Sequence, residues 1–149
     1  MSVESTLKAV LEADATLLAL ATGGVWSWDE TGEKGLSRTL TPAAFDSFGV
    51  IKPCVMVGAR AANPDPSIAD DTGQIVATRQ VVECYIMADS GYSTHESIAN
   101  RIYTLLQAKM ISGAGRVDWA GSIRMGRDLD LNANVLRDDW LTVRIRSGS

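Results

Sequence analysis

The sequence is poor in the residue types that most active sites and metal sites need. Its 149 residues include one histidine, His95, and two cysteines, Cys54 and Cys84. The wide spacing of the cysteines matches no zinc or redox motif, and their apolar surroundings predict two buried, reduced thiols, with a disulfide between neighbouring strands as the alternative. The sequence also has no G-x-S-x-G turn, no Walker loop and no G-x-G-x-x-G after a strand. We therefore expect no enzyme activity and no cofactor.

Long apolar runs are missing as well. No run approaches the roughly 20 residues that cross a bilayer. Glu4 lies where a secretory signal peptide would be basic. We therefore expect a protein that is made in the cytoplasm and has no membrane partner.

An excess of positive charge is also missing. The chain has 14 basic and 18 acidic residues, a net charge of −4 and a pI of about 4.9. A protein with this net negative charge is unsuited to binding the phosphates of a nucleic acid. Hydrophobic residues make up 46% of the chain, which is enough to form a core. The length is that of one ordinary domain, so we expect a single domain over residues 1–149.

Apolar residues at helical spacing predict a helix over residues 2–21. Ser2 is the expected N-cap, and Asp14 is expected to cap a second short helix after a break near Ala13. Glycines 23 and 24 then end the helical segment.

A second helix is predicted over residues 94–110, where Ile98 and Ile102 begin an apolar stripe. Ser93 and Glu96 have the spacing of a capping box before it. This assignment places His95 in the exposed first turn, where the helix dipole disfavours its cationic form.

Alternating apolar residues predict strands over residues 25–29, 51–59 and 74–89, and a C-terminal hairpin built from 122–131 and 140–146. Residues 29–49 and 61–73 are predicted to be loops. In the 74–89 strand, the face with Glu83, Tyr85 and Met87 is mixed rather than polar, which indicates partial cover by another segment. The pattern predicts an α+β fold: a mostly antiparallel sheet with an N-terminal helix and a second helix packed on one face.

The stretch "DLDLNANVLRDD", residues 128–139, comes closest to a metal-binding motif. Asp128, Asp130 and Asn132 match the first three ligand positions of a calcium loop. Ala133 stands where that loop needs glycine, and Asp139 where it needs glutamate. A polar turn between two strands is therefore the preferred interpretation, and a calcium-stabilised domain is the alternative.

Tryptophan and charge offer candidates for contact with a partner. Of the four tryptophans, Trp28 and Trp140 are candidates for a subunit boundary, although a place in the core is the commoner fate of tryptophan. Arg144 and Arg146 alternate with apolar residues near the C-terminus and are predicted to lie on the outer face of the sheet. A solvated face is the common interpretation of this pattern, and pairing with acidic groups of a neighbour is the alternative. The complete set of predicted interface residues is Trp28, Phe45, Asp65, Asp70, Asp71, Trp140, Arg144 and Arg146.

The segments "LKAVLEADATLLALATGGVW" and "HESIANRIYTLLQ", with the strands between and after them, resemble the tail terminator proteins of long-tailed phages. These are the lambda-like minor tail proteins that complete the tail. The resemblance covers nearly the whole chain by its layout and is specific in the two helices. The acidic loop at 61–73 departs from it.

The resemblance implies a structural protein of the virion. Its members form a hexameric ring that caps the tail tube, stops tail polymerisation and docks to the head connector or stopper protein. DNA passes through the lumen without specific binding. Two other functions stay open: another head–tail neck protein, such as a head-closure or stopper protein, and a small cytosolic α+β enzyme or ligand-binding domain.

Overall fold

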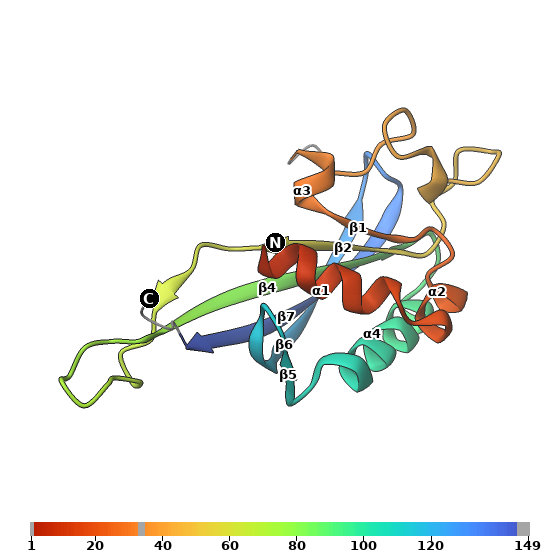
Figure 1. The fold of residues 1–149 in the computed structure, drawn as a ribbon. Helices are drawn as coiled ribbons and strands as arrows, with labels where there is room; N and C mark the ends of the chain where they lie inside the picture. Colours follow the sequence, from red (N-terminus) through yellow and green to blue (C-terminus); the bar gives the residue numbers. More distant parts are fainter. Residues whose placement is uncertain (1, 33–34, 146–149) are drawn as a thin grey trace.

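The computed structural model describes residues 2–32 and 35–145, which form the curled, mostly antiparallel sheet and the helices of an α+β fold (Figure 1). The strands are β1 (Val25–Ser27), β2 (Cys54–Ala59), β3 (Asn63–Pro64), β4 (Ala77–Ala88), β5 (Lys109–Ile111), β6 (Gly115–Asp128) and β7 (Ala133–Ile145). Their order is β1-β2-β4-β7-β6-β5, and β3 also pairs with β4. Of these pairs, β1–β2 is parallel and the others are antiparallel. The predicted fold class is therefore confirmed.

The N-terminal segment folds into two helices, α1 (Val3–Glu12) and α2 (Ala15–Leu20). The Ser2 side chain accepts a hydrogen bond from the Ser5 backbone N–H at 3.0 Å, and Asp14 accepts one from that of Leu17 at 2.8 Å. Both predicted caps and the break near Ala13 are confirmed.

The second long helix, α4 (Ser93–Leu106), differs from the prediction at both ends. Ser93 is its first residue and makes no capping box, while Glu96 forms an ion pair with Arg124 of β6 at 2.7 Å. The helix ends before Ala108, which has a left-handed φ of 59°, and the chain continues into β5. The predicted helical residues 107–110 are therefore a turn and the start of a strand.

The helices α1, α2 and α4 cover one face of the sheet, here called the inner face (Figure 1). The core under them includes Leu7, Leu17, Ile98 and Trp140, none of which is exposed. It also includes Cys84, which has no exposed surface. Burying these large side chains supplies the main driving force for the fold.

A second core covers part of the opposite, outer face of the sheet. It contains Phe45, Met56 and Met87, and segment 35–51 packs over this part of the face. The predicted partial cover beside Met87 is thus confirmed. The segment is not wholly irregular: α3 (Trp28–Thr31) precedes it, and it contains the 3₁₀ helix η1 (Pro42–Ala44). Trp28, expected in a strand, begins α3.

The two cysteines belong to these two cores on opposite faces of the sheet. Cys54 lies in the outer core and Cys84 in the inner core, and both are buried, free thiols. Burial raises the pKa of the Cys54 thiol to about 12, so it stays protonated at neutral pH. The prediction of buried, reduced cysteines is confirmed, and the disulfide alternative is wrong.

None of the helices in the described part of the chain is long and apolar enough to cross a membrane.

Candidate interaction surfaces

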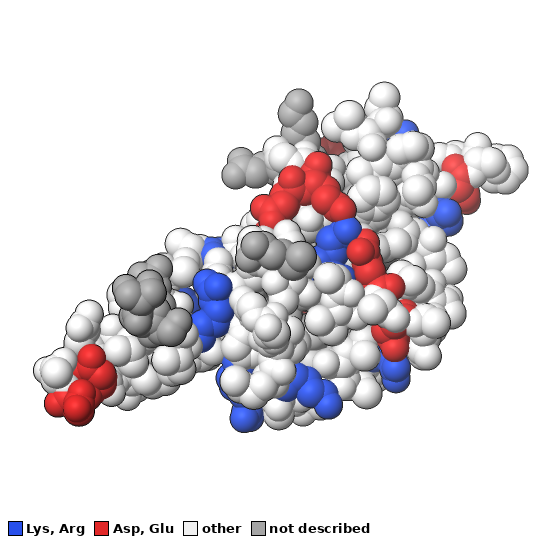
Figure 2. Space-filling model, in the orientation of Figure 1, with Lys and Arg blue, Asp and Glu red and all other residues white. Residues whose placement is uncertain are grey.

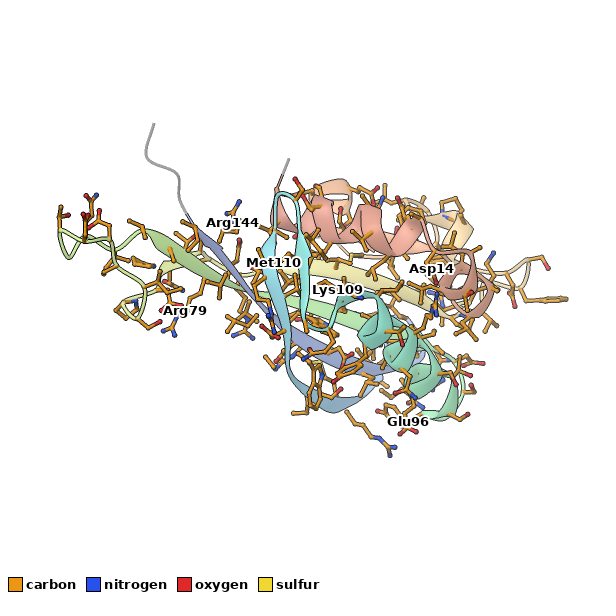
Figure 3. The ribbon with its side chains drawn as sticks, turned by 60° about the horizontal axis from the view of Figure 1, so that its bottom comes forward. Asp14, Arg79, Glu96, Lys109, Met110 and Arg144 are labelled. Atoms are coloured by element: carbon orange, nitrogen blue, oxygen red, sulfur yellow. The ribbon has the colours of Figure 1, made fainter. Side chains whose placement is uncertain are left out.

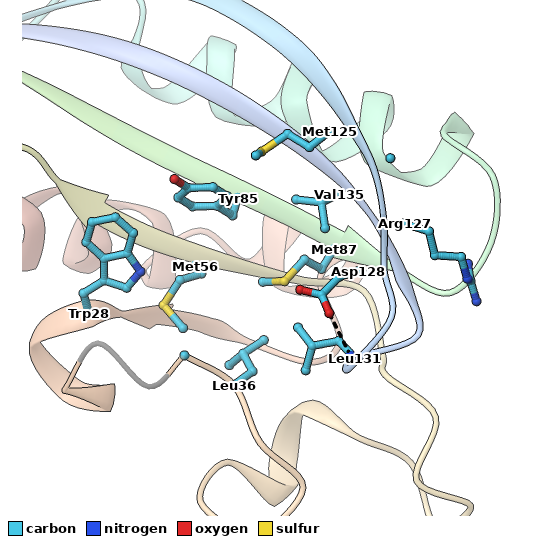
Figure 4. Close-up of a pocket in the computed structure, with 12 residues that line it drawn as sticks. Trp28, Leu36, Met56, Tyr85, Met87, Met125, Arg127, Asp128, Leu131 and Val135 are labelled. Atoms are coloured by element: carbon cyan, nitrogen blue, oxygen red, sulfur yellow. Dashed lines mark hydrogen bonds between the residues drawn. The ribbon is translucent and has the colours of Figure 1, made fainter.

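An apolar pocket of about 400 Å³ opens on the outer face where the second core ends (Figure 4). Trp28 forms one wall, with its ring centroid 5.8 Å from that of Tyr85. Three methionines give the pocket an adaptable lining. The side chains that line it are Trp28, Leu36, Met56, Tyr85, Met87, Met125, Arg127, Asp128, Leu131 and Val135.

A row of charged groups crosses the sheet beside this pocket. Glu83, with 2% of its surface exposed, accepts hydrogen bonds from Arg60 and Tyr85 and lies 3.5 Å from Arg137. Arg137 in turn pairs with Asp139 at 3.0 Å. Burial alone would raise the pKa of Glu83, but the bonds from Arg60 and Tyr85 outweigh it and the pKa is lowered.

Tyr85 and Glu83 of this row each keep one protonation state at neutral pH. Burial, followed by the hydrogen bond to Glu83, raises the pKa of Tyr85 to about 12, so the phenol keeps its proton. Glu83, with its lowered pKa, keeps its negative charge. Neither group is poised to exchange protons near pH 7, as a general acid or base would be. The row ties the residue that follows β2 to β4 and β7 by charge-assisted hydrogen bonds.

A narrow arm projects from the end of the sheet where β4 begins (Figure 1). This arm, residues 61–76, is a hydrogen-bonded ribbon rather than the irregular loop that its composition predicts. Asp65 N–H donates to the Ala77 carbonyl at 2.9 Å, and Asp70 N–H donates to the Gln74 carbonyl at 2.8 Å. β3 extends the ribbon by pairing with β4.

The three predicted acidic interface residues lie on this arm. Asp65 and Asp70 each stabilise a turn: Asp65 accepts from both the backbone and the hydroxyl of Ser67, and Asp70 accepts from those of Thr72. These bonds lower the pKa of both carboxyls. Asp71 is exposed at the tip. Asp65 lies at the base of the arm, where it is only 9% exposed. Figure 2 shows acidic side chains at the free end of the arm.

The β6 strand forms a long sheet edge, because β5 pairs only with residues 115–117 of it. Beyond that point Ile123 and Met125 are each 51% exposed, and the edge carries two bulges. Exposed edges invite pairing with another chain, while bulges limit uncontrolled pairing. This edge is the second candidate interaction surface.

The other predicted interface residues fall in different places. Phe45 is 7% exposed under the Arg38 guanidinium, whose carbon lies 4.9 Å from the ring centroid. Arg144 is half-buried at the end of β7. Arg146 lies outside the described residues. Trp140 is fully buried in the inner core, which corrects its assignment to an interface.

The sidedness of β7 explains the correction for Trp140. Trp140 and Thr142 face the helices, whereas Leu141 and Val143 lie on the outer face and are half-buried. Alternation separates these two sets but does not say which set the helices cover. The sequence analysis did not identify Met56 and Met125 as pocket residues. The mixed polar and apolar face around Met87 was the one feature of the sequence that pointed to a partly covered surface there.

The stretch 128–139 forms the turn between β6 and β7 and the first half of β7. Asp128 Oδ1 accepts hydrogen bonds from the backbone N–H groups of Asp130 and Leu131 at 2.9 and 3.0 Å, and Asn132 Oδ1 accepts from Arg127. The preferred interpretation as a polar turn is confirmed. Across residues 2–32 and 35–145, no three His, Cys, Asp or Glu side chains group as metal ligands.

His95 is buried, not exposed as predicted. Its Nε2 lies 2.7 Å from the Asn134 carbonyl and its Nδ1 lies 3.2 Å from the Gly91 carbonyl. The ring therefore joins the start of α4 to the start of β7, which is a structural role.

The whole arrangement of helices and sheet has a counterpart among solved structures. The fold resembles that of a chain in the virion of a native gene transfer agent particle. The TM-score is 0.62, and the match covers 95% of this chain and 93% of that chain at 14% sequence identity. At this identity the likeness shows a shared fold. No family model and no curated protein matches the sequence.

Proposed function

We propose that the protein is a structural component of a phage-like virion, and that it acts there as a tail terminator. The observation that carries this proposal is the fold match to a chain of a gene transfer agent virion, which extends over nearly the full length of both chains. The sequence resemblance to tail terminators supports the same function.

In this function, six copies form a closed ring on the last ring of the tail tube. Different surfaces of one chain meet in such a ring, so that closure uses every complementary surface and no further subunit can add. The projecting arm and the long β6 edge are the surfaces that suit this association. One side of the ring covers the tube, and the other docks to the head connector or stopper protein.

The acidic composition suits a ring that surrounds DNA. With a net charge of −4, the chain repels phosphates rather than binding them. DNA can therefore move through the lumen during ejection without adhering to it.

The alternatives receive less support. A head-closure or stopper protein would more often be a small closed β-barrel, whereas this sheet is open, with β1 at one end and β5 at the other. The Glu83 row does not supply a general acid or base that exchanges protons near neutral pH. The apolar pocket remains compatible with a ligand-binding domain.

Deletion of the coding sequence from the genome that carries it tests the proposal. We expect separate heads and tails, with tail tubes of variable and excessive length, in electron micrographs. A plasmid copy of the wild-type sequence should restore joined particles with uniform tails. Particles of normal shape and tail length without the protein would overturn the proposal.

A further inference from the structure

The acidic end of the arm is separated from the rest of its own chain. The ribbon runs away from the sheet (Figure 1), and its backbone hydrogen bonds keep the tip from folding back. In the described part of the chain, no hydrogen bond or ion pair engages the Asp71 carboxylate. Ile75, close to it, leaves 45% of its surface exposed. The tip thus combines negative charge with an exposed apolar side chain.

A row of side chains on the outer face carries positive charge and apolar groups, which complement the negative charge and the apolar side chain of the tip. Strand register places Arg79 of β4 beside Val143 of β7, Val143 beside Arg116 of β6, and Arg116 beside Met110 of β5. The row therefore alternates cation and apolar residue across four strands. Arg79 is exposed, and Met110 is 76% exposed (Figure 3).

The arginines of this row are free to change partners. Arg116 pairs with Asp118 on the same strand at 3.0 Å, and the two side chains are 52% and 39% exposed. Such a surface pair contributes little and exchanges readily for another carboxylate. The Arg79 side chain makes no hydrogen bond or ion pair with any other described residue, although its charge acts on the Asp65 carboxylate of the same chain and helps to lower the pKa of that group.

We propose that the arm of one copy docks on the outer-face row of the next copy. Asp71 faces Arg79 and Arg116 of the neighbour, and Ile75 packs against its Val143 and Met110. Because the donor and the acceptor are different surfaces of the same chain, the contact is head-to-tail and propagates around a ring. The inference rests on the proposed ring, for which it names the contacts.

Disulfide trapping tests this contact directly. One variant carries both Ile75→Cys and Met110→Cys; the native cysteines are buried and do not compete. After oxidation at high concentration, and on purified tail tubes, we expect a ladder of covalent multimers on a denaturing gel. Each single-cysteine variant is the control and should stay monomeric, because it offers only one end of the contact; dimers of either single variant would show that the ladder comes from 75–75 or 110–110 disulfides and would overturn the assignment.

Charge reversal supplies a second readout. Adding Asp71→Lys to the double-cysteine variant should lower the yield of the ladder at least about tenfold, because it places like charges together. Asp130→Lys, which makes the same charge change in the β6–β7 turn, should leave the yield unchanged. High salt, about 0.5 M, should reduce the ladder as Asp71→Lys does.

The outcomes separate the two proposals. If the wild-type protein forms rings on tubes but the double-cysteine variant gives no ladder, the arm contact is wrong and the ring proposal stands. If the ladder forms but Asp71→Lys and Asp130→Lys reduce it equally, the charge pairing is wrong. If neither ring nor ladder forms in any condition, both proposals fail.

Discussion

Arg101 of α4 holds Asp14, the N-cap of α2, by two parallel hydrogen bonds. Nη2 lies 2.7 Å from Oδ1, and Nε lies 2.8 Å from Oδ2. Oδ2 also accepts the backbone N–H of Leu17. One carboxylate therefore caps a helix and joins it to another, which makes the packing of α2 on α4 sensitive to the charge of Asp14.

This pair predicts a loss of stability in acid. The bond from Arg101 lowers the pKa of Asp14 from its ordinary value of 3.8 to about 2. The folded state therefore binds this proton less readily than the unfolded state, and the stabilisation is present above pH 3.8 and lost as the pH falls toward 2. Urea unfolding over this range should show a smaller decline for Asp14→Asn, which keeps the cap, than for the wild type. Parallel pH profiles would contradict the assignment.

Asp138 should show the opposite pH dependence. It is buried on the inner face, and burial raises its pKa even though Ser122 and Trp119 donate hydrogen bonds to it. Burial disfavours the ionised carboxylate in the folded state. The contribution of Asp138 to the free energy of unfolding therefore declines as the pH rises above 3.8. We expect Asp138→Asn to be at least as stable as the wild type at pH 7 in urea unfolding. A clear loss of stability at pH 7 would show that the ionised group is needed.

Gly58 has to remain glycine because the Trp28 ring lies against it. A β-carbon at position 58 would overlap the indole. We expect Gly58→Ala to lower the free energy of unfolding by about 1–3 kcal/mol, because the Trp28 wall of the pocket must shift. Gly91→Ala is the matched control, since a β-carbon there meets open space. Equal stability of the two variants would rule out close packing of Trp28 on β2.

Trp140 should behave as a core residue. We expect Trp140→Ala to cost about 3–5 kcal/mol in thermal or urea unfolding. Trp140→Phe should cost less, because the indole Nε1 has no hydrogen-bond partner within the described chain and its removal leaves no partner unpaired. Trp119→Ala, at a position 48% exposed, is the comparison and should cost the least. A small effect of Trp140→Ala would return this residue to the list of interface candidates.

Local sequence patterns predicted several local features correctly, although the capping box at Ser93 is absent. The caps at Ser2 and Asp14 involve only residues that are close in the sequence. The mixture of polar and apolar residues on one face of β4 indicated that another segment partly covers it. The buried cysteines likewise follow from their apolar strands. These features depend on propensity and alternation, which a single sequence contains.

Features that depend on distant contacts were not predictable. His95 is buried because the Asn134 carbonyl meets its ring from β7, 39 positions along the chain. The arm has the prolines and aspartates of a loop, yet pairing with the residues before and within β4 turns it into a ribbon. The pocket needs Trp28, Met87 and Met125 to meet from three separate elements. Strand register and the side covered by helices decide all three cases.

Cryo-electron microscopy of purified tail tubes mixed with the protein tests the central claim most directly. The proposal predicts a closed ring of six copies at one end of each tube, with the arm of every copy on the outer face of the next. Tubes treated in this way should also stop growing when more tube subunits are added. Tubes that show no added density at either end, and that keep growing in the presence of the protein, would contradict the proposal.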